Sequence, residues 1–430
     1  MKLGFIVQRY GTEVLGGSEY HCRLLAERLA AQHEVEVLTT CARDYITWAN
    51  EYPEGSDRIR GVTVRRFPNS QTRDIATFNE YSTWIFSHEH SRAEEMEWLK
   101  QQGPWSPALI EYLRRNQQQY DVLIFFTYLY ATTVVGLEVC PTRSVLVPTT
   151  HDEPAAYLSI YKDVFARPAA IMFNTEIERR FIYRQFPDRP LLEETVGVGV
   201  DVPQSQPYPR MPASDELLPG RDQEEETEET AGEHGSIRDF PSHLMARGAV
   251  FRRRHRLHGP IALYGGRIDP GKGCEELIEY FSAYVKEGGD ATLALMGAKL
   301  MALPEEPFIR FAGLLSDSER IQALEAATVV VCPSPYESLS MLALEAFSVG
   351  SPVLVNARSE VLVEHCVRSN AGLYYANRDE FVECMQLLMR DPDLREAMGQ
   401  NGREYVQTNY RWDVILSKYE RTFANVRNAR

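Results

Sequence analysis

The stretch IALYGGRIDPGKGCEELIEYFSAYVK, residues 261–286, joins an apolar run to an amphipathic segment through a glycine-rich turn. The apolar run predicts a buried strand, and the segment from Cys274 to Lys286 predicts a helix with one apolar face. A strand joined to a helix by a short loop is the unit of which parallel α/β sheets are built. This order of elements therefore predicts an α/β fold with its ligand-binding loops at the ends of the strands.

The turn GRIDPGK, residues 266–272, has the spacing of a nucleotide phosphate loop. In such loops a Ser or Thr after the lysine ligates Mg²⁺, whereas this chain has Gly273 there, which offers no ligand. Arg267 adds a second cation that a phosphate loop does not require. We therefore expect phosphate binding without a metal ion. The letters DPG within the turn would also suit an ordinary surface turn, which is the alternative.

The same alternation of apolar runs and amphipathic segments recurs along the whole chain. Strand-like runs lie at residues 2–8, 33–40, 62–67, 121–126, 144–149, 169–174, 192–198, 261–265, 291–297, 308–313, 328–332, 352–356 and 372–375. Helix-like segments lie at residues 19–31, 176–185, 274–286, 317–327, 339–349 and 380–389. Two such sets predict two Rossmann-like, doubly wound domains that face each other across a central cleft.

Net charge and cysteine usage narrow the class of protein. The 430 residues carry a formal charge of −15, and nine acidic residues against one arginine lie between Asp215 and Glu233. This segment has no apolar periodicity, so we expect it to be disordered, and the remaining mild acidity argues against nucleic-acid binding. Seven scattered cysteines predict no disulfide framework. Without a secretory signal at the N-terminus or an apolar run of membrane-spanning length, the expected location is the cytoplasm.

Two further loops follow predicted strands of the first half. GGSE, residues 16–19, opens a helix and leaves backbone amides that an anion or a sugar hydroxyl could approach, although a helix cap with glycines for packing fits equally well. PTTHDEP, residues 148–154, places His151, Asp152 and Glu153 at a strand end. These side chains suit proton transfer or contact with substrate hydroxyls, and an N-cap aspartate beside a space-filling histidine is the alternative.

The loop and helix PSPYESLSMLALEAFSVGSP, residues 333–352, carry the strongest signal. We expect Ser338 or Ser340 to cap a helix that ends at Val349. Helical side chains lean towards the N-terminus of their helix, so Glu345 is expected to point back towards Glu337 and the free amides. A carboxylate there could accept hydrogen bonds from a ribose diol while the amides take a phosphate. A solvated Glu345 and a Glu337 that only favours the helix dipole are the alternative.

Together these motifs, with VGVGVD at residues 196–201 and NGREYVQTNYRWDVILSKYE at 401–420, resemble a retaining glycosyltransferase of family 4. The resemblance runs over nearly the whole chain except the acidic segment, and it implies the GT-B fold. TTCARDYITWANEYPEG, residues 39–55, and CPSPYESLSMLALEA, residues 332–346, look like a bacterial subset of that family. The family commonly has Glu-Gly-Phe-Gly where this chain has Glu337-Ser-Leu-Ser, which puts the close approach that glycine permits in doubt.

Carried over to this chain, the resemblance implies a role for each matching residue. Arg267 and Lys272 would bind the diphosphate of a nucleotide sugar, Glu345 its ribose and Glu337 the transferred sugar. The implied catalytic residues are Glu337, His151, Arg267 and Lys272. The implied nucleotide-sugar contacts are Gly17, Gly266, Arg267, Lys272, Glu337, Ser338, Leu339, Ser340, Met341 and Glu345. The implied acceptor-side residues are Gly16, Gly17, Glu19 and Asp152.

The implied activity is metal-independent transfer of a glycosyl group, with retention, from a nucleoside-diphosphate sugar to a hydroxyl acceptor. That acceptor would be a glycan or a lipid-linked molecule, and peripheral contact with a membrane is compatible with it. We expect no cofactor. A sugar-nucleotide epimerase on the same fold, or a binding protein or scaffold without turnover, are the alternatives.

The acidic segment divides the chain and sets the expected domain organisation, and the resemblance implies the course of the C-terminal helix. An acceptor-side domain covers residues 1–203, a linker with the acidic segment covers 204–258, and a nucleotide-sugar-binding domain covers 259–408. A C-terminal helix at residues 409–430 is expected to cross back to the first domain.

Overall fold

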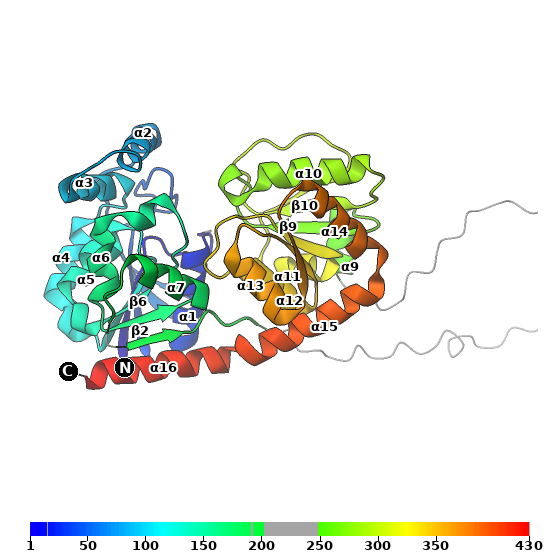
Figure 1. Cartoon of the computed structure of the whole chain (residues 1–430). Coiled ribbons are helices and arrows are strands. Elements are labelled where there is room, and N and C mark those ends of the chain that lie inside the picture. The colour runs from blue at the N-terminus through cyan, green and yellow to red at the C-terminus, as the bar shows by residue number, and fades with distance from the viewer. Residues whose placement is uncertain (15, 191, 202–247, 430) are drawn as a thin grey trace, which may run out of the picture.

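The computed structural model describes residues 1–14, 16–190, 192–201 and 248–429. It contains two β-sheets, each covered by helices on both faces, which lie side by side (Figure 1). The predicted architecture of two Rossmann-like domains is therefore confirmed. The predicted disorder of the acidic segment concerns residues outside this set.

The first sheet has eight strands in the order β3-β4-β2-β1-β5-β6-β7-β8. Neighbouring strands run parallel except β3 and β4, which are antiparallel. The strands are β1 (Lys2–Ile6), β2 (Glu34–Thr40), β3 (Gly55–Ile59), β4 (Val62–Phe67), β5 (Val122–Phe126), β6 (Ser144–Val147), β7 (Ala170–Phe173) and β8 (Leu192–Thr195). The carboxyl ends of all these strands except β3 therefore meet at one edge, where the GGSE and PTTHDEP loops lie.

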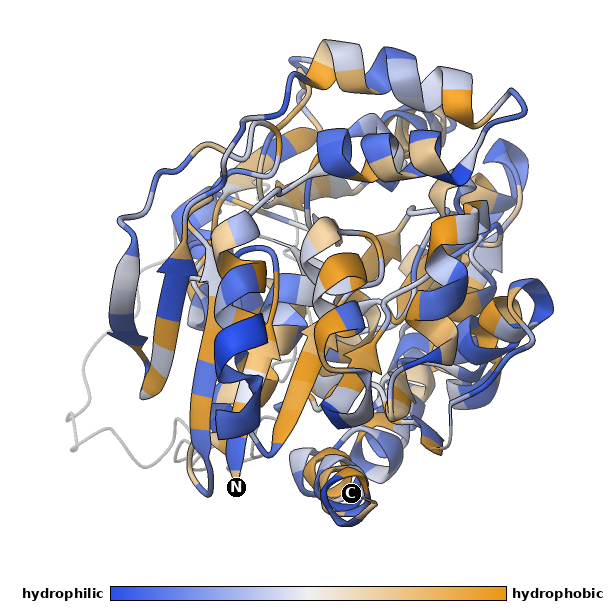
Figure 2. Cartoon of the chain, turned by 90° about the vertical axis from the view of Figure 1, so that its left-hand side faces the viewer, coloured by the Kyte–Doolittle hydropathy of each residue, from blue (hydrophilic) through white to orange (hydrophobic). Residues whose placement is uncertain are grey.

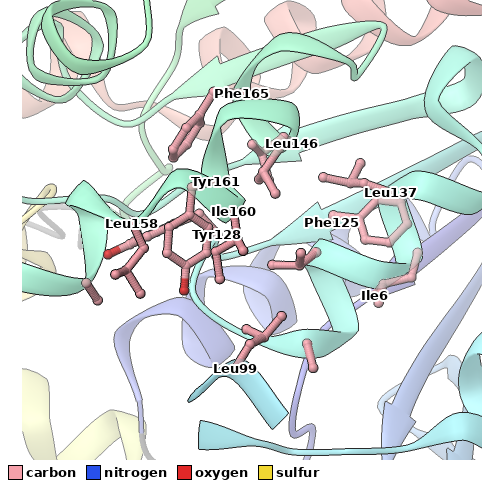
Figure 3. Close-up of a cluster of buried hydrophobic side chains, with 14 of the residues drawn as sticks. Ile6, Leu99, Phe125, Tyr128, Leu137, Leu146, Leu158, Ile160, Tyr161 and Phe165 are labelled. Atoms are coloured by element: carbon pink, nitrogen blue, oxygen red, sulfur yellow. The ribbon is translucent and has the colours of Figure 1, made fainter. Parts of the chain in front are cut away.

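Alternate residues of these strands face two separate hydrophobic cores. In β5, Leu123 and Phe125 belong to one core, and Val122 and Ile124 belong to the other. The first core, part of which is drawn in Figure 3, is closed by α2 (Ile75–Ile85), α3 (Arg92–Gln102), α4 (Pro107–Asn116), α5 (Ala131–Val139), α6 (Lys162–Ala166) and α7 (Glu176–Gln185). The second is closed by α1 (Gly17–Leu29) and α16 (Trp412–Asn428).

The second sheet has six parallel strands in the order β11-β10-β9-β12-β13-β14. These strands are β9 (Ile261–Gly265), β10 (Thr292–Met296), β11 (Ile309–Gly313), β12 (Val329–Cys332), β13 (Val353–Asn356) and β14 (Gly372–Tyr375). Its helices are α9 (Ala249–His255), α10 (Cys274–Lys286), α11 (Asp317–Ala326), α12 (Met341–Val349), α13 (Glu360–Ser369), α14 (Arg378–Arg390) and α15 (Pro392–Asn409). Helices α10 and α14 pack on one face of this sheet, and α9, α11, α12 and α13 pack on the other.

Two neighbouring segments pass between the domains. The VGVGVD segment places Val196 in a core of the first domain and Val200 in a core of the second. The N–H of Val200 donates to the Tyr410 carbonyl over 2.8 Å, at the point where the chain returns. Trp412 packs against both cores, and a Cβ on Gly199 would lie 2.2 Å from its ring. The glycine at position 199 therefore leaves room for Trp412 at the joint.

The C-terminal helix α16 belongs to the core of the first domain although it follows the second in sequence. Ile415, Tyr419, Phe423 and Val426 lie on one face of the helix and are buried against the first sheet. Figure 1 shows α15 and α16 running in succession along the second and then the first domain. The return of the chain therefore ties the two domains together a second time.

Most predicted strands and helices match those of the structure, with one strand missed. β3 has the sequence GSDRI, of which four residues are exposed and the fifth is half-buried. It offers no apolar run because it lies at the edge of the sheet and pairs on one side only. In Figure 2 the orange of hydrophobic residues appears on inner strands of the sheet and also on the helices that cover it. No helix in the described part of the chain is long and apolar enough to cross a membrane.

Candidate functional site

In the loop after β9, the carboxylate of Asp269 positions two basic residues, Arg267 and Lys272. Asp269 begins the short 3₁₀ turn Pro270–Lys272, and its Oδ1 accepts the backbone N–H of Lys272 over 2.9 Å. Its Oδ2 lies 3.5 Å from Nε of Arg267. The Tyr264 hydroxyl donates to the carbonyl of Arg267 over 2.6 Å. The segment is therefore a turn, and at the same time it holds Arg267 and Lys272 at the carboxyl edge of the second sheet.

Glycine is required in this loop for a steric reason. Gly273 has φ of +74° and is the N-cap residue of α10, and a Cβ there would lie 2.4 Å from the Pro333 carbonyl oxygen. Gly266 has φ of +146°, and a Cβ on Gly297 would lie 1.8 Å from its carbonyl oxygen. A hydroxyl side chain after Lys272, as in a phosphate loop that binds Mg²⁺, would therefore have to displace the β12–α12 loop.

That close approach brings Lys272 to the β12–α12 loop. Its Nζ donates to Oε1 of Glu337 over 2.9 Å and lies 3.5 Å from Oγ of Ser334. The side chains of Lys272 and Glu337 keep 29% and 20% of their surface exposed, so both remain accessible to a ligand. The structure thus brings together two of the predicted catalytic residues from separate strand ends.

The start of α12 differs from the expected serine cap. Helix α12 begins at Met341, and Ser340 precedes it with φ of +63° and no side-chain cap hydrogen bond. The expectation that Ser340 caps the helix is wrong, because a left-handed residue directs its side chain away from the helix amides. Ser338 instead accepts a 3.4 Å hydrogen bond from Nδ2 of Asn174 in the first domain. Gly350 ends the helix after Val349, as predicted.

The backbone between these serines is held by a buried histidine. Nε2 of His365 donates to the carbonyl of Leu339 over 2.8 Å, and Nδ1 lies 3.0 Å from the Tyr405 hydroxyl. Burial lowers the pKa of His365 to about 4, so the imidazole is neutral at physiological pH. A neutral imidazole fixes the 338–340 backbone without adding charge to the site.

Glu345 lies within α12 and is buried next to an arginine. Nη2 of Arg320 donates to Oε1 of Glu345 over 2.8 Å and also to the Tyr20 hydroxyl of the first domain. Burial raises the pKa of Glu345 to about 7, although Arg320 acts in the opposite direction. The alternative of a solvated glutamate therefore does not hold, and the carboxylate has one oxygen engaged by Arg320.

The GGSE loop combines an open glycine with an engaged carboxylate. A Cβ on Gly17 would meet nothing within 4 Å, whereas one on Gly16 would lie 2.1 Å from Oε2 of Glu19. Glu19 is buried and accepts a 3.0 Å hydrogen bond from Nε of Arg9. Burial raises the pKa of Glu19, but Arg9 outweighs this effect and leaves the pKa low. The space beside Gly17 is therefore the part of this loop that a ligand can approach.

An aromatic residue of the first domain covers Arg267. The guanidinium carbon of Arg267 lies 5.1 Å from the ring centroid of Tyr45. Burial lowers the pKa of Arg267, but Tyr45, Asp269 and Tyr130 together raise it above its usual value. Arg267 is therefore permanently charged, and it contacts Tyr45 of the first domain and Asp269 of the second.

The PTTHDEP loop meets the second domain through His151. The imidazole of His151 stacks on the Tyr336 ring, and the ring centroids lie 5.7 Å apart. Tyr336 directly precedes Glu337 in the sequence. Asp152 is exposed and accepts a 2.7 Å hydrogen bond from the Tyr157 hydroxyl. The alternative of an aspartate helix cap does not hold, because no side-chain cap hydrogen bond begins the turn at Pro154–Tyr157.

Several residues around the site were not predicted. They are Tyr20, Tyr45, Asn174, Asp269, Arg320, Tyr336 and His365. Tyr45 lies in the TTCARDYITWANEYPEG stretch, which resembles a subset of one family. The sequence therefore marked this stretch but did not indicate what Tyr45 does. Tyr20 and Arg320 come from different domains and have no motif of their own.

Solved structures with a similar arrangement of domains include glycosyltransferases. Sucrose-phosphate synthase from Thermosynechococcus elongatus matches with a TM-score of 0.69 at 17% identity, over 100% of both chains. HepE from Anabaena in complex with UDP-glucose matches with a TM-score of 0.65 at 15% identity, over 99% of this chain and 100% of its own. At these identities the likeness establishes the GT-B fold.

Sequence comparison finds a family to which the second domain is similar. Residues 250–405 match the family described as glycosyl transferases group 1. A GDP-mannose-dependent monoacylated alpha-(1-6)-phosphatidylinositol monomannoside mannosyltransferase of Corynebacterium glutamicum is 26% identical over 172 residues, 36% of this chain and 45% of its own. Alpha-D-kanosaminyltransferase of Streptomyces kanamyceticus is 28% identical over 179 residues, 38% of this chain and 46% of its own. The chain thus spans about half the length of these relatives, and its similarity to the glycosyl transferases group 1 family lies in residues 250–405.

The contact between Gly273 and Pro333 predicts a specific loss of stability. Gly288, just after α10, also has a left-handed φ of +90°, but a Cβ there would meet nothing within 4 Å. We expect Gly273→Ala to lower the free energy of unfolding by about 1–3 kcal/mol more than Gly288→Ala, because only the first adds a clash to the backbone strain. Urea unfolding of both variants measures the difference, and equal losses would contradict the steric explanation.

Proposed function

We propose that the protein transfers a glycosyl group from a nucleoside-diphosphate sugar to a hydroxyl acceptor. The observation that carries the proposal is the pair of cations, Arg267 and Lys272, on one loop, with Lys272 in contact with Glu337. Two fixed positive charges suit a diphosphate, and an adjacent carboxylate suits the hydroxyls of the sugar attached to it. The names of the curated relatives support this class of reaction.

In this proposal the cations act on the leaving group. A departing nucleoside diphosphate gains negative charge as the glycosidic bond breaks, and preorganised cations stabilise that charge. Gly273 offers no metal ligand, so Arg267 takes the place of the second positive charge that Mg²⁺ supplies in phosphate loops. The proposed reaction is therefore metal-independent.

The remaining residues bind the rest of the substrates. Glu345 is proposed to accept hydrogen bonds from the ribose, and the 338–341 backbone to face the phosphates. His151 is proposed to contact the transferred sugar, while the space at Gly17 admits the acceptor hydroxyl. Retention of the anomeric configuration is proposed from the resemblance to family 4, and the acceptor is proposed to be a glycan or a lipid-linked molecule.

Removing either cation is expected to impair turnover far more than binding. We expect Arg267→Ala and Lys272→Ala each to lower kcat/KM by about 10²–10³, the effect of losing one preorganised donor at a developing charge. Lys286→Ala, an exposed lysine at the far end of α10, is the matched control and should retain activity. Turnover of a panel of nucleotide sugars, followed as release of the nucleoside diphosphate, should also survive EDTA.

Two results would contradict this assignment. Chelation that abolishes turnover, with recovery on adding Mg²⁺, would show that a metal ion, and not Arg267, supplies the second positive charge. Nucleotide binding without turnover of any sugar, in the presence of varied acceptors, would favour a binding protein or scaffold.

The raised pKa of Glu345 predicts that nucleotide affinity depends on pH. An ionised carboxylate accepts hydrogen bonds from both ribose hydroxyls, so affinity for a nucleoside diphosphate should rise as pH passes upward through about 7. Glu345→Gln cannot titrate, and we expect it to bind about 10–100-fold more weakly at pH 8, with a smaller deficit at pH 5.5. Calorimetric titration measures the affinity of the wild type and of Glu345→Gln for the nucleoside diphosphate at each pH. Ionisation of the phosphate affects both affinities equally, so it cancels when one is divided by the other. A deficit that is constant with pH would contradict the ribose role.

A further inference from the structure

Glu153 joins a buried tyrosine to His151. The Tyr128 hydroxyl donates to Oε1 of Glu153 over 2.6 Å, and the other carboxylate oxygen lies 3.5 Å from Nε2 of His151. Tyr128 lies two residues beyond β5, and Glu153 lies in the loop after the neighbouring strand β6. The contact therefore connects two strand ends of the first domain with the imidazole that meets the second.

The tyrosine at the inner end of this chain of contacts is immobilised by packing. Tyr128 is 1% exposed and meets the ring of Tyr161 edge to face with centroids 4.7 Å apart (Figure 3). Phe165 closes the same pocket, with its ring centroid 5.7 Å from that of Tyr128. Burial raises the pKa of Tyr128 well above its usual range, so the hydroxyl is always protonated and able to donate.

Glu153 is the carboxylate that such a contact requires. Burial by itself would raise the pKa of Glu153, but His151, Tyr128 and Lys272 outweigh that effect and leave its pKa below the usual value. The group is therefore ionised at neutral pH. One oxygen is held by Tyr128, and the other is free to accept a hydrogen bond from the imidazole.

The backbone of the loop is fixed independently, from the β7 side. Glu178 is buried and accepts the N–H of Thr150 and, over 2.6 Å, the N–H of Asn174. Thr149, just before, has a left-handed φ of +51°, which a β-branched residue adopts only when its surroundings impose it. The position of His151 between the domains is thus set by the backbone, which leaves the orientation of its ring to Glu153 and Tyr336.

We propose that Glu153 is a positioning residue that, with Tyr128, fixes the tautomer and orientation of His151. When Nε2 of a neutral imidazole donates to a carboxylate, Nδ1 carries the lone pair and can only accept. With one face of the ring on Tyr336 and Nε2 on Glu153, His151 presents Nδ1 as an acceptor for a substrate hydroxyl. The contact of 3.5 Å is long, as is common for site hydrogen bonds before substrate is bound. The role in turnover rests on the proposed function.

The first arm of the test needs no turnover. In protein labelled with ¹⁵N at histidine, the imidazole signals of His151 are assigned by their loss in His151→Gln. We expect the wild type to show the tautomer protonated at Nε2 at neutral pH. Glu153→Ala should produce a mixture of tautomers, and Tyr128→Phe a smaller change in the same direction. Tyr161→Phe, whose hydroxyl donates to the Leu129 carbonyl in the same core, is the control and should match the wild type.

The second arm measures turnover with a nucleotide sugar. Loss of a residue that orients a catalytic group costs about 10–100-fold, and we expect that loss in kcat/KM for Glu153→Ala. Affinity for the nucleoside diphosphate should be unchanged, and Glu153→Gln should recover part of the activity because its amide oxygen still accepts from Nε2. A wild-type tautomer in Glu153→Ala, or unchanged kcat/KM in that folded variant, would overturn the proposal. Failure of the wild type to turn over any nucleotide sugar would instead count against the proposed function. The ¹⁵N experiment would still show whether Glu153 fixes the tautomer of His151.

Discussion

The site depends on the close approach of Gly273 to the Pro333 carbonyl. Because a Cβ would lie 2.4 Å from that oxygen, only glycine lets the β9–α10 loop reach the β12–α12 loop. The approach brings the amine of Lys272 into contact with the carboxylate of Glu337. In the same turn, the carboxylate of Asp269 lies beside the guanidinium of Arg267. What resembles a phosphate loop with a missing hydroxyl is therefore a different structure, in which Gly273 packs against a neighbouring loop at the position where a phosphate loop carries its hydroxyl side chain.

Contacts between the domains are made by the residues proposed to bind substrate. His151 stacks on Tyr336, Arg267 lies under Tyr45, and Arg320 joins Glu345 to Tyr20. The two chain crossings at residues 196–200 and 410–412 hold the domains at the distance at which these contacts form. A ligand that binds Arg267, or that draws Arg320 away from Tyr20, would exchange contacts between the domains for contacts with itself. We therefore expect ligand binding to be coupled to the arrangement of the domains.

Much of the fold could be predicted because its signal is local. Strands such as β9 and β12 are continuous apolar runs, and α10 and α7 begin and end at the predicted residues. β3 was not predicted, because an exposed edge strand needs no apolar residues. The two-domain organisation followed from the number of strand and helix pairs on each side of the acidic segment.

The site could be predicted only where a motif marks it. Lys272, Glu337 and Glu345 stand in recognisable loops, yet the arginine that engages Glu345 and the tyrosine that covers Arg267 come from distant positions without a pattern. The left-handed Ser340 also escaped prediction, since serine caps helices far more often than it adopts a positive φ. Side chains of different domains that meet are placed by the packing of whole domains, and a sequence window of a few residues does not contain that information.

Glycosyl transfer with retention is tested most directly by proton NMR of the anomeric signals during incubation with nucleotide sugars and varied hydroxyl acceptors, in the presence of a chelator. We predict that one nucleotide sugar is consumed and that the first product signal has the anomeric configuration of that sugar. A product of inverted configuration would contradict the proposed retention, and an unconsumed nucleotide sugar that nevertheless binds would contradict glycosyl transfer itself.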